Sequence, residues 1–465
     1  MAIHNKPVTL TFFITLFQTM STGVMFSLTV LYLTLSLKIG ETEAYALNTA
    51  LFSLFYCLPL IAGIIADRLL NAKQTLVIGQ IISIIGFFVL GFMGKQLLSA
   101  SLSCIAIGGA FYLPSVWKLL NSCFEGHLHK RSYYFTVAYI SLATGGLIAT
   151  FSSGYIADFL GYQAAFYIAA IYNIISLILF LLFHHIYPVS NDRPSHKARR
   201  YSTFILIATF VIVYILIKHP YRSMEVIYLV GILLLVYFVY LALGAKSSSR
   251  KKGILKFMAF CFINVAYWSV ATLAQTNITT FAKYNLNRHI FNFIYPAGSV
   301  ISLWYVSMFI CAILISVLWY RKLRHNAFDL KFFIGLSVTA LAGVSIPFSI
   351  SMTQTGSQVA FIWIILFFFF LGLGEILVQP NGNAAAGEYI PEHLRGFALG
   401  AWQFASGLGV AISGQLSMLT VTQNHAHDLV KSNHAYSETF FYIAIGCFLF
   451  ALLTYGINRR LKIDH

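Results

Sequence analysis

The sequence predicts an all-α membrane protein that crosses the bilayer many times, and three observations support this class. Hydrophobic residues make up 59% of the chain and charged residues only 9%, whereas about 25% of the residues of soluble proteins are charged. Apolar runs of about 20 residues, each long enough to span a bilayer as a helix, recur from end to end. The runs are continuous and do not alternate with polar residues, which excludes a membrane β-barrel.

Fourteen apolar segments are expected to form membrane-spanning helices. The first of them has no small-residue cleavage site, so we expect it to be retained as a helix and not removed as a signal peptide. In chain order the expected spans are 9–37, 44–66, 73–94, 98–123, 133–158, 163–187, 201–217, 225–245, 254–282, 297–320, 331–353, 358–381, 393–420 and 436–457.

The net charge of +16 indicates orientation in the membrane and does not indicate nucleic-acid binding. If the N-terminus is cytoplasmic, most lysine and arginine residues fall in inside loops, as the positive-inside rule requires. We therefore expect a multi-pass protein of the bacterial inner membrane with both termini in the cytoplasm. The lipid bilayer is its expected surrounding, and nucleic acid is not an expected partner.

The spacing of the spans suggests two similar halves with an insertion. Six helices form an N-terminal bundle within residues 1–187, and six more form a C-terminal bundle within residues 257–465. Between them, residues 188–256 are expected to hold a basic linker, a two-helix hairpin and a second basic linker. Paired six-helix bundles are a common plan of secondary transporters, whose substrates bind near the middle of the membrane.

Glu375 is the most informative residue, because it lies in an apolar stretch that is expected to cross the bilayer. A carboxylate at that depth costs about 2.5–3.5 kcal/mol on insertion scales, so such residues usually face a cavity or a partner. Alone in a low dielectric, a carboxyl group favours its neutral form. Glu375 is therefore a candidate both for proton uptake and for pairing with a cationic substrate; the alternative is a structural carboxyl group held inside the bundle.

The loop after the second span contains Gly63, Asp67 and Arg68. A small residue allows two helices to approach closely, and an acid–base pair at the helix end can hold the helices in one state and release them in another. We expect these three residues to act in gating; the alternative is an ordinary charged loop.

No catalytic motif is present, since the chain lacks a nucleophile elbow, an HExxH sequence and a phosphate-binding loop. An enzyme activity is therefore not expected. No cofactor is expected either. Without a nucleotide site, transport would have to be driven by a gradient. His425, His427, His434 and Asp428 share one predicted outer loop, but their spacing fits no standard zinc pattern, and no metal site is expected.

Several segments together resemble the major facilitator superfamily, and more specifically its proton-dependent oligopeptide transporter family. They are residues 63–79, 105–125, 135–145 and 268–282, the pair Gly374-Glu375, and residues 391–402. The resemblance covers nearly the whole chain, and bacterial members of that family also carry two extra helices between the halves. It implies alternating access and uptake of di- or tripeptides with protons.

The resemblance also suggests which side chains meet a substrate. In that family the glutamate that matches Glu375 contacts the amino terminus of the peptide. Gln275 and Thr276 belong to a polar run in the seventh helix of the shared plan, which either lines a cavity or makes interhelical hydrogen bonds. Tyr32, Tyr139 and Trp402 are candidates for stacking on a substrate, although aromatic residues, at 16% of the chain, more often pack or face lipid.

The chain also departs from the family pattern, because most charged and amide groups expected around a peptide are replaced. The first-helix cluster ExxER, which is linked to proton coupling in the family, is absent. Glu375 remains. The residues that occupy the family's charged and amide positions in this sequence are Thr15, Gln18, Thr19, Phe26, Leu113, Ala143 and Trp304.

Three functions are compatible with this pattern. The first is a secondary active transporter that takes up di- or tripeptides, or peptide-like small molecules, together with protons. The second is a proton-driven exporter of an amphipathic amine, a drug or a metallophore, since an apolar cavity with one acid suits such cargo. The third is a receptor on the same scaffold that binds a ligand without moving it.

Overall fold

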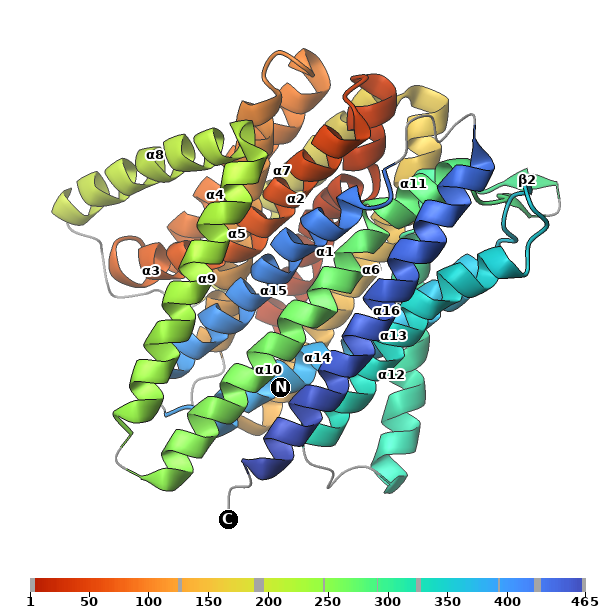
Figure 1. Ribbon diagram of the computed structural model, residues 1–465. Coiled ribbons are helices and arrows are strands. Elements are labelled where there is room, and N and C mark those ends of the chain that lie inside the picture. Colours follow the sequence, from red (N-terminus) through yellow and green to blue (C-terminus); the bar gives the residue numbers. More distant parts are fainter. Residues whose placement is uncertain are drawn as a thin grey trace. The chain divides into compact units, whose positions relative to one another are not determined.

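Long apolar runs fold into helices throughout the computed structural model (Figure 1). The structure describes residues 5–123, 128–187, 196–245, 247–290, 292–322, 328–391, 394–421 and 428–461. Within these residues the only strands form one short hairpin, so the predicted all-α class is confirmed. Thirteen described helical segments are long and apolar enough to cross a membrane. The fourteenth expected span corresponds to α15 (Arg395–Met418), whose glycine, serine and glutamine residues lower its hydropathy.

Contacts between residues divide the chain into two units. Unit 1 comprises Met1–Ile39 and Ala50–Pro220, and unit 2 comprises Gly40–Thr49 and Tyr221–His465. This division falls between the two helices of the expected hairpin, so the first of them groups with the N-terminal helices and the second with the C-terminal helices. The separation of the hairpin as a segment of its own, between two six-helix bundles, stays a prediction.

Unit 1 is built around contacts of α1 with α6 and α7, and of α4 with α5 and α7. Small residues allow the close approach of α4 and α5, because a Cβ atom added at Gly79 would lie 2.9 Å from the Gly108 carbonyl oxygen. The elements before Pro220 are α1 (Asn5–Leu31), the π-helix η1 (Tyr32–Ser36), α2 (Glu41–Cys57), α3 (Pro59–Arg68), α4 (Ala72–Met93), α5 (Leu98–Ser122), α6 (Leu128–Leu160), α7 (Tyr162–Phe183), η2 (His184–Ile186) and α8 (His196–Lys218).

Unit 2 is built around contacts of α10 with α14 and α15, of α13 with α14 and α16, and of α12 with α14. Its elements after α8 are α9 (Pro220–Leu243), α10 (Ser248–Ala271), η3 (Thr272–Ala274), α11 (Asn277–Tyr284), β1 (His289–Ile290), β2 (Phe293–Ile294), η4 (Ala297–Ser299), α12 (Ser302–Lys322), α13 (Phe328–Ser351), α14 (Ile362–Tyr389), α15 and α16 (Leu429–Arg460). The strands pair antiparallel, with Ile290 opposite Phe293.

The second basic linker is shorter than expected, because α10 already begins at Ser248. The side chain of Ser247 caps this helix by accepting a hydrogen bond from the Arg250 backbone amide at 3.2 Å. Lys256, which falls both in the segment 188–256 and in the expected span 254–282, lies within the helix. It is 6% exposed.

One helix is shared between the units. The first residues of α2, up to Thr49, cluster with unit 2, and the remainder of α2 clusters with unit 1. No glycine or proline occurs between Glu41 and Cys57. The regular helix is interrupted only at Leu58, after which Pro59 starts α3.

Candidate functional site

Glu375 lies near the middle of α14 and is partly buried. Glycines beside it bring the neighbouring helices close. A Cβ atom at Gly372 would lie 2.9 Å from the Ser307 Cβ atom of α12, and one at Gly374 would overlap the Thr339 side chain of α13. Both glycines contact other helices, so α14 is held closely at the depth where its carboxyl group stands.

An aromatic frame surrounds the Glu375 carboxyl group. The Tyr267 hydroxyl group, on α10, donates a hydrogen bond to Oε2 of Glu375 at 3.3 Å. Trp304 and Tyr305, on α12, lie close to the same carboxyl group. The ring of Trp268 lies 5.8 Å from that of Tyr267 and 6.4 Å from that of Trp304. A carboxylate among aromatic faces suits an ammonium group, because charge pairing and cation–π attraction act together.

No described cation neutralises Glu375. The ion pairs between described side chains join Lys256 to Asp329, Lys431 to Asp428, and His434 to Glu438. Within the residues that the structure describes, the carboxyl group can therefore be balanced by a proton or by a cationic ligand.

The described part of unit 1 shows how the uncharged positions of the first helices are filled. Phe26 stacks on Phe52 with ring centroids 4.9 Å apart, and Leu113 packs against an apolar cluster that includes Tyr112. The Thr15 hydroxyl group lies 3.3 Å from that of Tyr112. These positions form neutral contacts, consistent with the absence of the charged cluster.

The seventh helix of the shared plan is broken where the sequence predicts a polar run. It consists of α10, η3 and α11, and Thr276 stands at the break with φ −108° and ψ −84°. Thr276 is fully buried and donates to Oδ1 of Asn277 at 2.8 Å, and Gln275 is 5% exposed. Asn277 in turn donates to the Ser417 carbonyl oxygen at 2.9 Å. Asn277 therefore makes an interhelical hydrogen bond, one of the two roles expected for the polar run. A substrate contact by Gln275 or Thr276 stays a prediction.

The predicted aromatic contacts are packed against protein in this structure. The Tyr32 hydroxyl group donates to the Leu90 carbonyl oxygen at 3.2 Å, and its ring lies 4.8 Å from that of Phe166. Trp402 is completely buried beside Phe332, with ring centroids 6.1 Å apart. The side chain of Tyr139 lies outside the described residues. A role of these three residues in substrate binding stays a prediction.

Gly382 allows the Trp402 ring to lie against α14, since a Cβ atom at that position would overlap the indole. We expect Gly382→Ala to destabilise the protein by about 1–3 kcal/mol, the usual cost of overpacking a core. The measurement is the thermal unfolding midpoint of the detergent-solubilised protein. Gly387→Ala, in the same helix, is the matched control, because no described atom lies within 4 Å of a Cβ built on Gly387. Equal midpoints for the two variants would contradict this packing role.

The predicted gate is described only in part. No described atom lies within 4 Å of a Cβ atom built on Gly63, so the close helix approach expected there is not seen in this structure. The side chains of Asp67 and Arg68 lie outside the described residues, as do His425 and His427 of the outer loop. A gating role for Gly63, Asp67 and Arg68 stays a prediction.

Sequence reasoning missed the residues that hold Glu375. Tyr267 precedes Trp268 in an ordinary apolar run, and 108 positions separate it from Glu375. The one sequence signal for this contact is that Tyr267 and Glu375 both fall near the middle of an expected membrane span.

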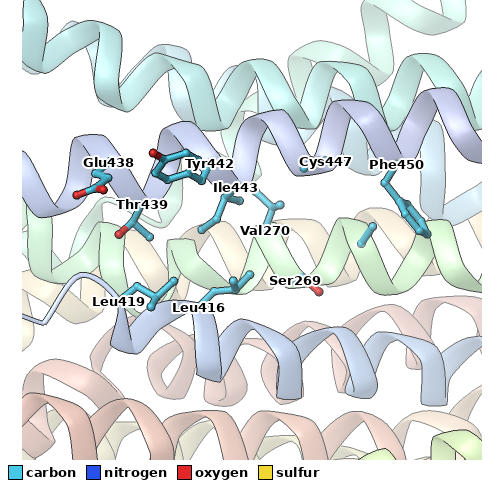
Figure 2. Close-up of a pocket in the computed structure, with 12 residues that line it drawn as sticks. Ser269, Val270, Leu416, Leu419, Glu438, Thr439, Tyr442, Ile443, Cys447 and Phe450 are labelled. Atoms are coloured by element: carbon cyan, nitrogen blue, oxygen red, sulfur yellow. The ribbon is translucent and has the colours of Figure 1, made fainter.

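A cavity of about 620 Å³ lies elsewhere in unit 2, between α10, α15 and α16 (Figure 2). Glu438 and Tyr442 lie at one end and Phe450 at the other. Glu438 is 58% exposed and pairs with His434 at 3.8 Å, and the lining is otherwise mainly apolar. None of the predicted substrate residues lines it, so we place the candidate site at Glu375.

Comparison with known proteins identifies relatives along nearly the whole chain. The sequence is 20% identical over 429 residues to dipeptide and tripeptide permease A of Serratia proteamaculans, covering 91% of this chain and 85% of that protein. It is 25% identical over 467 residues to dipeptide and tripeptide permease B of Photorhabdus luminescens, covering 96% and 94%. The predicted likeness to oligopeptide transporters is thereby confirmed.

Solved structures share the fold. A mutant peptide transporter in complex with alafosfalin superimposes with a TM-score of 0.86 at 18% identity, covering 98% of this chain and 94% of that one. A transporter in complex with 5-aminolevulinic acid superimposes with a TM-score of 0.85 at 18% identity, covering 98% and 96%. The profile of the Major Facilitator Superfamily matches residues 10–414. Since this match spans most of the sequence and the fold agrees with it, the chain belongs to the Major Facilitator Superfamily.

Proposed function

We propose that the protein takes up di- and tripeptides, or peptide-like small molecules, together with protons by alternating access. The observation that carries this proposal is the Glu375 carboxyl group, which stands near the middle of the membrane-length helix α14, hydrogen-bonded to Tyr267 and framed by aromatic rings. The names of the curated relatives, dipeptide and tripeptide permeases, support a peptide substrate. They give no support to the alternative of an amine, drug or metallophore exporter.

In this proposal Glu375 has two tasks in succession. It binds the ammonium group of the substrate when ionised, and it carries a proton when the substrate has left. The aromatic frame favours the first task by cation–π attraction. Low polarity around the carboxyl group favours the second, because a charge is costly at that depth. Both tasks need only the proton gradient, with no cofactor and no chemical conversion of the substrate.

The remaining assignments complete the proposal. Gln275, Thr276, Tyr32, Tyr139 and Trp402 contact the rest of the substrate in some state of the cycle. Gly63, Asp67 and Arg68 form the gate at one membrane face. The protein lies in the inner membrane with both termini in the cytoplasm, in line with the distribution of its basic residues.

The test is uptake of labelled dialanine and of a tripeptide into proteoliposomes, with and without an inward proton gradient. We expect accumulation above the external concentration only with the gradient, and its loss on adding a protonophore. No uptake by a folded, correctly inserted protein would contradict the proposal. Tight binding without flux would instead indicate a receptor.

Tyr267→Phe tests the role of the frame. Removing the hydroxyl group takes away a hydrogen bond to the Glu375 carboxylate and leaves the ring in place. Hydrogen bonds to charged groups contribute about 1.5–3 kcal/mol. Since this one is long, we expect the KM for dipeptide to rise about threefold to tenfold. Tyr442→Phe is the control, because Tyr442 is 64% exposed on α16; an equal KM change in both variants would contradict a role for Tyr267 at the site.

A further inference from the structure

A second cavity, of about 440 Å³, opens in unit 1 between the ends of α4, α7 and α8. Lys73 lies in the first turn of α4, and His184 directly follows α7. The Lys73 ammonium group donates to the carbonyl oxygens of His184 at 2.9 Å and of Tyr187 at 3.0 Å. Lys73 is thereby fixed at the mouth of the cavity with one N–H still available, because an ammonium group has three donors.

The polar groups of this cavity come from the first turn of α4, the residue after α7 and the second turn of α8. Ser202 and Thr203, near the start of α8, complete the mouth together with Lys73 and His184. No acidic residue is among the described residues that line the cavity. The mouth therefore carries positive charge and hydroxyl groups and suits a phosphate diester.

Apolar side chains lie deeper. Val77 and Ile78 line the cavity about 6 Å further along α4 than Lys73, at 1.5 Å per residue. Phe180 and Leu181 line it from α7, one turn before His184. Beyond the cavity both helices continue with exposed apolar side chains, such as Ile81 (43% exposed) and Ile178 (49% exposed). Apart from Leu70, the lining along α4 and α7 thus runs from charged and polar groups near the helix ends to hydrocarbon further along.

We propose that this cavity binds one anionic phospholipid, such as a phosphatidylglycerol. Its phosphate lies at Lys73 and His184, and an acyl chain lies along Val77, Ile78 and Leu181. Three features favour this occupant: the positive mouth, the polar-to-apolar order that matches a phospholipid in its leaflet, and the continuing apolar faces of α4 and α7. Basic pockets between membrane helices bind anionic headgroups by the same charge pairing. The lipid would link α8 to α4 and α7.

The test is lipid binding to the purified, delipidated full-length protein, followed by native mass spectrometry. Phosphatidylglycerol and phosphatidylcholine with identical acyl chains are compared at equal concentration. We expect one tightly retained phosphatidylglycerol. Lys73→Gln should weaken its retention about fivefold, the effect of one basic residue at an anionic surface. Lys95→Gln is the control, because Lys95 is exposed just beyond the other end of α4.

A groove-filling variant keeps the proposal testable if Lys73→Gln folds poorly. Ile78→Trp leaves the charges intact and fills the hydrocarbon part, so it should reduce retention of phosphatidylglycerol to the level of the phosphatidylcholine background. Equal retention of the two lipids by the unaltered protein would overturn the proposal. So would equal loss in Lys95→Gln and Lys73→Gln, or full displacement of the lipid by glycerol phosphate, which would indicate a site for a soluble phosphate.

Discussion

Replacing Glu375 with glutamine is expected to reduce proton-driven accumulation of dipeptide at least about thirtyfold while leaving the protein folded. Glutamine keeps the shape of the side chain and still accepts the hydrogen bond of Tyr267, but it neither takes up a proton nor carries a negative charge. Losing one partner of a buried charge pair costs about 2–5 kcal/mol, and 2 kcal/mol corresponds to this factor. The measurement is uptake into proteoliposomes with an inward proton gradient.

Exchange without a gradient separates the two tasks of Glu375. Labelled dipeptide inside the liposomes, exchanged against unlabelled dipeptide outside, requires binding and alternating access but no net proton movement. If exchange is retained while accumulation is lost, Glu375 carries the proton. If both are lost, Glu375 also binds the ammonium group of the substrate. Glu438→Gln, which alters an exposed acid, should leave both unchanged. Undiminished, pH-dependent accumulation by Glu375→Gln would refute a proton role.

Asp329→Asn is expected to destabilise the protein by about 3–5 kcal/mol. The Lys256 ammonium group lies 3.1 Å from Oδ2 of Asp329, and the two side chains are only 8% and 13% exposed. Removing one partner of a buried pair leaves an uncompensated charge, which is more costly than losing the pair. The Tyr389 ring, 5.7 Å from the ammonium nitrogen, offsets only part of this. The thermal unfolding midpoint of the purified protein measures the effect.

A second pair with the same separation provides the control. Lys431 and Asp428 also lie 3.1 Å apart, but their side chains are 77% and 34% exposed, and exposed pairs contribute at most about 1 kcal/mol. Asn at position 428 also preserves the cap of α16, since asparagine is as good a cap as aspartate. The double variant Lys256→Met/Asp329→Leu should recover most of the lost stability. Similar midpoints for Asp329→Asn and Asp428→Asn would contradict the buried-pair argument.

The positions of the membrane helices could be predicted from the sequence because the bilayer imposes a length and a polarity on each of them. Breaks within a helix could not. The interruption at Leu58 lies in a continuous apolar run. The polar run around Thr276 is equally compatible with an unbroken helix that makes interhelical hydrogen bonds. The expected span began at residue 254, after the actual start of α10, since Lys251 and Lys252 suggested a solvated linker although Ser247 caps a helix before them.

Glu375 itself could be identified from the sequence, because a lone acid in an apolar run carries a cost that has to be explained. Its partners could not. The contacts with Tyr267, Trp304 and Tyr305 join three helices through packing, and no local pattern encodes them. The Lys256–Asp329 pair, 73 positions apart, was missed in the same way.

The helix shared between the units has a mechanical consequence. Because α2 contains no glycine or proline, it bends little. A displacement of its first turns is therefore transmitted along the helix to Cys57. The interruption at Leu58, where Pro59 begins α3, is the point at which the two helices meet. Beyond this interruption, α3 ends at Arg68, in the predicted gate. Tilting the first turns of α2 is thus expected to displace the start of α3 and, with it, the predicted gate.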